Sequence, residues 1–250
     1  MTTKSLPLHI KNIHKHFGKK HVLNDISFDV KPGEIFGLIG LNGAGKTTLI
    51  KILLGLLKRD EGETLIFDQQ AIRPSTRKML SFLPEKFQPS PYLKGKEFLS
   101  LTLSWYGKSY DHEQARSGAK ALDLDPDALD LKITKYSKGM GQKLGLLSGF
   151  LIDAPLLMLD EPMSGLDPSA RIHLKDMLLD YKNKGNTIFF SSHILSDIDE
   201  ICDRIAVLHN NQMIFTGTPA EFKKEQKLDS LERAFLHAIN QDTQKEAKAA

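Results

Sequence analysis

The chain has 250 residues, of which 40% are hydrophobic and 26% charged, so it can bury a globular core and is not wholly disordered, collagenous or fibrous. Its 34 lysines and arginines against 31 aspartates and glutamates leave a net charge of +3, which gives no support for a nucleic-acid partner. No apolar run has the length of a signal peptide or a membrane span, so we expect neither secretion nor a bilayer crossing.

The N-terminal part of the chain changes from one pattern to another near residue 34. Residues 6–36 alternate short β-rich runs with turn signals, which predicts antiparallel strands. Residues 34–40 (EIFGLIG) then predict a short apolar strand, followed by a glycine-rich turn and a helix over residues 47–57. One face of that helix would carry Leu49, Ile52, Leu53 and Leu56. Strand, glycine loop and helix together are typical of the start of a βαβ unit.

The middle of the chain, residues 84–150, is rich in helix formers and poor in β-branched runs, so we expect a helical insert there. Two buried strands follow, PLLMLD at residues 155–160 and NTIFF at residues 186–190. A helix that starts near Pro168 separates them. Strands that alternate with helices in this way predict a mostly parallel sheet.

The C-terminal part predicts a hairpin over residues 204–217, with Asn210 and Asn211 at its turn. A last helix over residues 228–239 carries one apolar stripe, which favours core packing over a partner site, and residues 241–250 are expected to form a polar, mobile tail. Cys202 is the only cysteine, so no intramolecular disulfide can form; we expect a small core residue or a half-exposed helix residue.

The segment Gly40–Thr47 (GLNGAGKT) matches the pattern G-x-x-x-x-G-K-[ST], which predicts a phosphate cradle. Glycines let successive backbone N–H groups turn inward, and the following helix adds its positive N-terminal end. Lys46 would reach the β- and γ-phosphates, and the Thr47 hydroxyl would coordinate Mg²⁺. The same segment lacks the G-x-G-x-x-G fingerprint, which disfavours a dinucleotide-binding dehydrogenase.

Asp160 and Glu161 directly follow the apolar run LLML, at the carboxyl end of a predicted parallel strand. Adjacent strand residues point to opposite sides, so the two carboxylates can take different tasks. Asp160 would hold Mg²⁺, and Glu161 would orient or deprotonate the attacking water.

Five motifs in this order make the chain resemble the ATP-binding subunits of ATP-binding cassette (ABC) transporters from about Leu8 to Ile239. The Walker A motif corresponds to Gly40–Thr48 and the end of Walker B to Asp160. The stretch YSKGMGQ from Tyr136 resembles the signature motif LSGGQ, Ser164–Asp167 resembles the D-loop, and His193 resembles the switch histidine.

The resemblance implies an α/β fold with a P-loop NTPase core, an N-terminal antiparallel β subdomain and a helical signature subdomain. One ATPase domain would span residues 8–240, with the helical subdomain at about 84–150. It implies ATP and Mg²⁺ as cofactors and a head-to-tail dimer in which the phosphate loop of one chain faces the signature of the other.

The site residues that the resemblance implies fall into five groups. ATP would contact Phe17, Val22, Gly40, Leu41, Asn42, Gly43, Ala44, Gly45, Lys46, Thr47 and Thr48, with the Phe17 ring stacked on adenine. The partner's ATP would contact Ser137, Lys138, Gly139 and Met140, and Asp167 would belong to the D-loop. Catalysis would use Glu161, His193 and Lys46, and Mg²⁺ would use Thr47, Asp160 and Glu85. Core packing of Phe17 is the alternative to stacking.

Three positions depart from the commonest family pattern. Glu85 stands where most relatives have glutamine, and its charge would make the metal site more anionic. Lys138 and Met140 replace a glycine and the glutamine of the signature; Lys138 either approaches the partner's triphosphate or points outward. This combination resembles bacterial exporters whose ATPase is a separate polypeptide.

The leading hypothesis is therefore an ATP-hydrolysing transporter subunit, peripheral on the cytoplasmic face of the cell membrane, which serves membrane permease subunits and forms a homodimer or heterodimer. The surface for that partner would include Phe87, Pro89, Pro91 and Tyr92, unless this segment is a buried loop. The alternatives are a soluble ABC-type ATPase that does mechanical work on nucleic acid or ribosomes, and a nucleotide-sensing scaffold without turnover.

Overall fold

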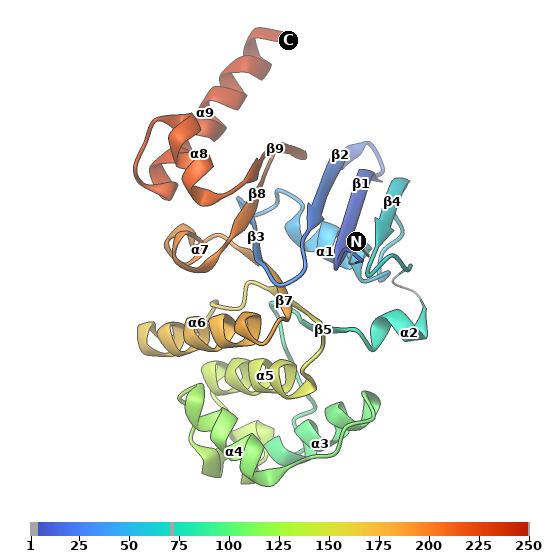
Figure 1. The fold of residues 1–250 in the computed structure, drawn as a ribbon, viewed down its shortest axis with the longest axis vertical. Coiled ribbons are helices and arrows are strands. Elements are labelled where there is room, and N and C mark those ends of the chain that lie inside the picture. Colours follow the sequence, from blue (N-terminus) through green and yellow to red (C-terminus); the bar gives the residue numbers. More distant parts are fainter. Residues whose placement is uncertain (1–4, 71–72, 250) are drawn as a thin grey trace. The chain divides into compact units, whose positions relative to one another are not determined.

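The computed structural model describes residues 5–70 and 73–249, with side chains up to residue 242 (Figure 1). The chain divides into two compact units. The first unit comprises the residues up to 71 and those from 191 onward, and the second comprises residues 72–190. No helix in the described part of the chain combines the length and the apolar content that a membrane crossing needs.

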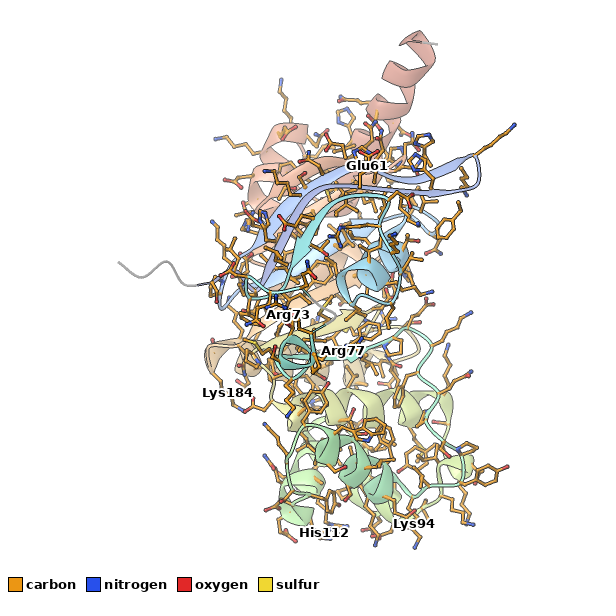
Figure 2. All side chains as sticks on the ribbon, turned by 90° about the vertical axis from the view of Figure 1, so that its right-hand side faces the viewer. Glu61, Arg73, Arg77, Lys94, His112 and Lys184 are labelled. Atoms are coloured by element: carbon orange, nitrogen blue, oxygen red, sulfur yellow. The ribbon has the colours of Figure 1, made fainter. Side chains whose placement is uncertain are left out.

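An antiparallel three-stranded sheet occupies the N-terminal part of the first unit, which confirms the predicted antiparallel strands. It consists of β1 (Leu8–Phe17), β2 (Lys20–Val30) and β4 (Glu61–Leu65), in the order β2-β1-β4. In Figure 1 the three strands lie side by side, and Glu61 at the start of β4 is labelled in Figure 2. Apolar residues of β1 and β2 are buried on one face, as the alternating pattern requires.

A second sheet in the first unit contains β3 (Ile35–Gly40), β8 (Arg204–His209) and β9 (Gln212–Gly217). Strands β3 and β8 are parallel and β8 and β9 are antiparallel, so this sheet is mixed. All six residues of β3 are buried, as expected for a parallel strand covered on both faces. Asn210 and Asn211 both have positive φ, 42° and 67°, which suits a tight hairpin turn and confirms the predicted hairpin.

The described residues of the first unit include the helices α1 (Lys46–Leu53), α7 (Leu195–Ile201), α8 (Pro219–Gln226) and α9 (Leu231–Ala249). Helix α1 is shorter than expected, and Leu56 is 66% exposed instead of sharing the buried face. The reason is Gly55, whose φ of 67° ends the helical path before Leu56. Cys202 directly follows α7 and is half-buried.

Helix α9 packs against α7 and α8 and buries the predicted apolar stripe, including Leu231, Phe235 and Ile239. It begins three residues later than predicted, at Leu231, and runs through Ala249 instead of ending near Ile239. The expected polar tail, residues 241–250, therefore falls largely in a helix; its side chains beyond residue 242, and residue 250, lie outside the described residues.

The second unit contains the parallel pair β5 (Leu80–Leu83) and β6 (Leu156–Asp160), preceded by the short helix α2 (Pro74–Arg77). Arg73 directly precedes α2 and Arg77 is its last residue; both are exposed (Figure 2). Helix α6 (Pro168–Asn183) follows β6, and β7 (Thr187–Ser192) leads the chain back to the first unit. The two predicted buried strands and the helix between them are therefore present.

The helical part of the second unit is built around α5 (Lys138–Ile152), on which α3 (Gly95–Trp105) and α4 (His112–Ala121) pack (Figure 1). Two short 3₁₀ helices, η1 (Pro126–Asp130) and η2 (Ile133–Lys135), connect α4 to α5. Residues 142–149 of α5 are all buried, so this helix forms the core of the region. The Asp125–Pro126 break in the sequence corresponds to the start of η1.

Candidate functional site

The glycine loop between β3 and α1 has a backbone path that requires glycine at both ends. A Cβ atom added at Gly40 would lie 2.7 Å from the carbonyl oxygen of Leu208. Gly45 has a φ of 110°, and a Cβ atom there would lie 2.8 Å from the carbonyl oxygen of Val22. Gly43 also has a positive φ, 85°, but the space beside it is open. The first and last glycines thus pack the loop against neighbouring strands.

Lys46, the first residue of α1, is 6% exposed, and its Nζ atom donates a hydrogen bond of 2.7 Å to the carbonyl oxygen of Gly40. Helix α1 has no side-chain acceptor at its N-cap, Gly45, and no acidic residue in its first turn. The N-cap and first turn of α1 therefore supply no carboxylate of their own to offset the positive end of its dipole, which favours an anion site. Thr47 is exposed at this end of the helix.

Phe17 ends β1 and is 51% exposed, which excludes the alternative of core packing. The Nζ atom of Lys15 lies 5.4 Å from the centre of its ring. Val22 is half-buried, and its carbonyl oxygen faces Gly45 of the glycine loop. The first unit therefore presents an aromatic ring suited to stacking and holds Val22 against the cradle.

His193 follows β7 directly and is exposed. Its backbone conformation is fixed by a local turn, because the amide of Ile194 donates a 3.0 Å hydrogen bond to the hydroxyl of Ser192. His193 therefore lies directly after the buried strand β7.

Asp160 and Glu161 in the second unit are 2% and 7% exposed. Asp160 is the last residue of β6, as predicted. Glu161 is not part of the strand: its φ of 51° turns the chain away, so the alternation of strand side chains does not apply to this pair. The premise that alternation separates their tasks is wrong, and the turn at Glu161 sets the direction of its side chain instead.

Ser137 is the N-cap of α5, and its hydroxyl accepts a 3.2 Å hydrogen bond from the amide of Met140. Helix α5 therefore begins directly after Ser137. The start of α5 lies beside Gly165: a Cβ atom at Gly165 would be 3.3 Å from Cε of Lys138, and a Cβ atom at Gly139 would be 3.5 Å from the Gly165 carbonyl oxygen. The exposed Lys138 side chain therefore lies beside Gly165 of the D-loop segment of its own chain.

Asp167 is the N-cap of α6 and accepts a 2.9 Å hydrogen bond from the amide of Ala170. That bond lowers the pKa of the Asp167 carboxyl, because it stabilises the charged form. The residue expected in the D-loop therefore already has a structural task, which is to start α6.

A cavity of about 410 Å³ in the second unit brings Glu85 together with Ser137 and Lys138 of the signature segment. Its remaining walls come from the 86–89 segment, from α5 and from the two flanking loops: Lys86, Phe87, Gln88, Pro89, Ile133, Tyr136, Gly141, Gln142 and Ser164. No sequence pattern singled out Tyr136 or Gln142 as a site residue. Gln142 is buried and donates to the carbonyl oxygen of Pro162, which its place in an apolar helix did not indicate.

Two of the four residues expected to form the partner surface line this cavity, and the other two face solvent. The four residues are Phe87, Pro89, Pro91 and Tyr92. Phe87 and Pro89 line the cavity, whereas Tyr92 is 82% exposed and Pro91 is exposed beside it. This segment is therefore not a buried loop.

The groups expected to hold Mg²⁺ are the exposed hydroxyl of Thr47 in the first unit and, in the second unit, the buried carboxylate of Asp160 and the exposed carboxylate of Glu85. Among the described residues, no three His, Cys, Asp or Glu side chains gather into a metal cage. A magnesium ion in phosphate chemistry uses one or two protein oxygens and completes its shell with phosphates and water, so hard oxygen ligands of this kind fit it.

A glycine loop that follows a buried parallel strand and places a lysine at the start of a helix defines a P-loop nucleotide-binding protein. Residues 23–164 match the family model described as ABC transporter, which covers more than half of the chain. The chain belongs to the ABC transporter ATP-binding family.

The chain is 39% identical to an uncharacterized ABC transporter ATP-binding protein of Synechocystis sp., over 81% of this chain and 58% of that protein. It is 31% identical to the linearmycin resistance ATP-binding protein LnrL of Bacillus subtilis, over 94% of this chain and 76% of that protein. It is 38% identical to a fluoroquinolones export ATP-binding protein of Mycobacterium tuberculosis, over 79% and 65% respectively. The match thus spans less than two thirds of the Synechocystis and Mycobacterium relatives.

A solved structure described as the ATP-binding subunit of an ABC transporter superposes with a TM-score of 0.85 at 32% sequence identity. The match covers 92% of this chain and 98% of the other. The P-loop ABC ATPase fold, with its mixed sheet, flanking helices and three-stranded antiparallel sheet, is therefore established for this chain.

Proposed function

We propose that this chain binds and hydrolyses ATP as a subunit of an ABC transporter, and that it drives export through separate membrane subunits. The observation that carries the proposal is the cradle of Gly40 to Lys46, where two glycines without room for a side chain hold the loop around an uncapped helix N-terminus. The relative named for fluoroquinolones export supports the outward direction.

In the proposed ground state, the N–H groups at the start of α1 and the Lys46 ammonium bind the phosphates, while Phe17 stacks on adenine beside Val22. Lys46 exchanges its hydrogen bond with Gly40 for one with a phosphate oxygen, which is the stronger, charge-assisted bond. Leu41, Asn42, Ala44 and Thr48 contribute backbone or side-chain contacts along the same loop. Mg²⁺ held by Thr47 and Asp160 would neutralise charge on the β- and γ-phosphates.

In the proposed hydrolysis, Glu161 accepts a proton from a water molecule as the water oxygen forms a bond to the γ-phosphorus. The bond between the γ-phosphorus and the β–γ bridging oxygen breaks, and ADP and inorganic phosphate are released. His193 contacts the γ-phosphate and helps to place it. Glu85 would add a further charged group near the metal.

Two copies, or one copy and a related chain, would close around two ATP molecules. Ser137 and the first residues of α5 would then meet the γ-phosphate bound by the partner, since a helix N-terminus favours an anion. Lys138 and Met140 replace smaller or neutral residues of the common signature, and Lys138 adds a positive charge to that end. Asp167 would lie near the same interface through the D-loop.

The membrane subunits would contact the segment around Phe87 and Tyr92, which places the chain on the cytoplasmic face of the membrane. None of the relatives named above is described as acting on nucleic acid or ribosomes, so that alternative gains no support. The scaffold alternative is separated from the proposal by turnover, since a scaffold would bind ATP without releasing phosphate.

A pull-down with tagged Glu161→Gln chain and MgATP from detergent-solubilised cells of the source organism tests the transporter part. Lys46→Ala, at an ATP concentration that saturates only the parent, is the matched control. The expected result is a multi-spanning membrane protein that is captured by the loaded form and lost in Tyr92→Ala. Capture of ribosomes or nucleic acid, with no membrane protein, would overturn the transporter part and leave the ATPase part in place.

A further inference from the structure

Two segments of the second unit that are distant in the sequence, 91–95 and 131–134, are paired as a short antiparallel ladder around a bridge between Lys94 and Lys132. Three backbone hydrogen bonds join them: Ile133 N to Leu93 O at 2.9 Å, Thr134 N to Pro91 O at 3.2 Å and Gly95 N to Leu131 O at 3.2 Å. The 91–95 segment begins with Pro91 and Tyr92 of the proposed partner surface, and the 131–134 segment lies shortly before Ser137 in the chain. Because backbone hydrogen bonds lie on both sides of the bridge, the two segments are held against each other.

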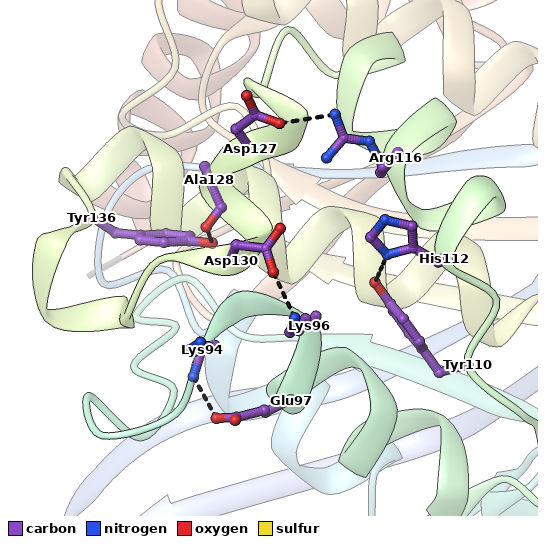
Figure 3. Close-up of polar contacts among 10 residues, drawn as sticks. All are labelled: Lys94, Lys96, Glu97, Tyr110, His112, Arg116, Asp127, Ala128, Asp130 and Tyr136. Atoms are coloured by element: carbon purple, nitrogen blue, oxygen red, sulfur yellow. Dashed lines mark hydrogen bonds and ion pairs between the residues drawn. The ribbon is translucent and has the colours of Figure 1, made fainter.

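Tyr136, the residue before Ser137, closes this arrangement with its side chain. Its hydroxyl donates a 2.7 Å hydrogen bond to the carbonyl oxygen of Ala128 in η1, as Figure 3 shows. The same oxygen accepts a 2.9 Å bond from the amide of Leu131, so both of its lone pairs are used. Burial, and to a lesser degree the charge of Asp130, raises the pKa of Tyr136 to about 12, so the phenol remains a donor at neutral pH.

Gly95, the first residue of α3, has no side chain and so leaves room for the Tyr136 hydroxyl. A Cβ atom at Gly95 would collide with that oxygen, and the next nearest atom, Cα of Leu129, would be 3.1 Å away. Gly95 is therefore explained by the close approach of the phenol and not by a turn. The ion pair between Lys96 and Asp130, 2.6 Å long and partly exposed, adds a weaker link between the same elements (Figure 3).

We propose that Tyr136 is a positioning residue that fixes Ser137 relative to the start of α3, so that contact at the 87–92 surface sets the orientation of the signature residue. The inference rests on the proposed function, in which Ser137 meets ATP bound by a second chain. The partner surface at 87–92 overlaps the 91–95 segment, and backbone hydrogen bonds join that segment to 131–134. The hydrogen bond from the Tyr136 phenol to η1, beside Gly95, then holds the adjacent Ser137 in place.

The first test is Tyr136→Phe in a Glu161→Gln background, with Tyr110→Phe as the matched control. Tyr110 lies in the same unit, and its hydroxyl has only a long contact, 3.4 Å, with His112 (Figure 3). Loss of one buried hydrogen bond should weaken the ATP-dependent dimer roughly five- to tenfold, while ATP affinity of the monomer stays within about twofold of the parent. Sedimentation and equilibrium ATP binding measure the two quantities separately.

The second test uses the collision between positions 95 and 136. Gly95→Ala alone should displace the phenol and weaken the dimer, whereas in the double variant Gly95→Ala/Tyr136→Phe the added methyl group occupies the space of the missing hydroxyl. The two changes are therefore expected to be non-additive, with the double variant no weaker than Tyr136→Phe. Additive losses would show that the contact does not position Ser137.

Amide exchange without nucleotide provides a readout that does not depend on ATP. The amide of Met140, which donates to Ser137, should exchange faster in Tyr136→Phe than in Tyr110→Phe, while the amides of α4 keep their protection. Faster exchange throughout α3 and α4 would show a merely structural role. A parent that fails to dimerise with ATP contradicts the proposed function itself, whereas a dimerising parent with Tyr136→Phe equal to Tyr110→Phe overturns only the positioning role.

Discussion

The Lys46 ammonium and the Gly40 carbonyl oxygen are joined by a 2.7 Å hydrogen bond that closes the glycine loop on itself. The lysine is buried at the first position of α1, so the loop is held in shape before any phosphate is present. A preformed loop avoids the entropic cost of ordering its residues on binding, which favours tight recognition of a nucleotide.

Replacement of Lys46 by alanine removes the only charged side chain of the loop. We expect ATP affinity to fall by about 10- to 100-fold, the value of a charge-assisted hydrogen bond to phosphate. Titration calorimetry with MgATP measures it. Lys51→Ala, on the exposed side of the same helix, is the control and should bind as the parent does. Unaltered binding in Lys46→Ala would refute the cradle assignment.

Alanine at Gly45 and at Gly43 separates steric packing from backbone strain. Both glycines have positive φ, but only the Cβ atom at position 45 would meet neighbours, the Val22 oxygen at 2.8 Å and Leu23 Cδ2 at 2.9 Å. We expect Gly43→Ala to lower the free energy of unfolding by about 1–2 kcal/mol. Gly45→Ala should lower it by about 3 kcal/mol or more, because strain and overlap add. Urea unfolding without nucleotide measures both, and equal losses would contradict the packing described for Gly45.

Glutamine at Glu161 keeps the shape of the side chain and removes its ability to accept a proton. Phosphate release should slow by about 100-fold or more, while ATP still binds. The variant should then accumulate as a dimer in sedimentation with MgATP. Glu225→Gln, an exposed position on α8, is the control and should turn over normally. Turnover at the wild-type rate in Glu161→Gln would mean that another residue is the base.

Aspartate at Ser137 keeps an N-cap acceptor for α5 but places a negative charge at the end that would meet the partner's phosphate. The variant should be as stable as the parent and bind ATP as a monomer, yet fail to dimerise. Thr218→Asp, the same change at the N-cap of α8, is the control and should dimerise. A normal dimer of Ser137→Asp in sedimentation would contradict the proposed contact across the dimer.

The free energy of unfolding should depend on pH through the carboxylate of Asp60. The Nζ atom of Lys15 lies 2.7 Å from its carboxylate, and the amide of His16 donates to it at 2.6 Å. These bonds, the Lys15 contact first, lower the pKa of Asp60 from 3.8 to about 2. A lowered pKa means that the contribution to stability is complete above 3.8 and is lost as the pH falls toward 2.

Asp60→Asn removes this contribution. The variant should therefore unfold more easily than the wild type at pH 7, and the difference should close between pH 3.8 and about 2. Thermal melts of both proteins over this range provide the measurement. A difference that persists unchanged at pH 2 would show that it does not arise from the carboxylate charge.

The hairpin at Asn210 and the strand that ends at Asp160 could be predicted from the sequence because their signals are local. Asn-Asn suits a turn with two positive φ angles, and an unbroken apolar run before two carboxylates is typical of a buried parallel strand. The position of Leu56 could not be predicted, because a single glycine before it decided between a longer helix and a turn. Glu161 likewise left the strand through its own positive φ.

By itself, the sequence determined the order of strands and helices and the glycine loop with Lys46, because each depends on residues that are close in the chain, and it determined the ABC family through five motifs in a fixed order. Tertiary structure alone decided that Gly45 packs on Val22, that Glu85 shares a cavity with Lys138, and that Tyr136 reaches Ala128 beside Gly95. Periodicity and motifs report which face of an element is buried, whereas these contacts depend on how separate elements are placed by the packing of the whole core.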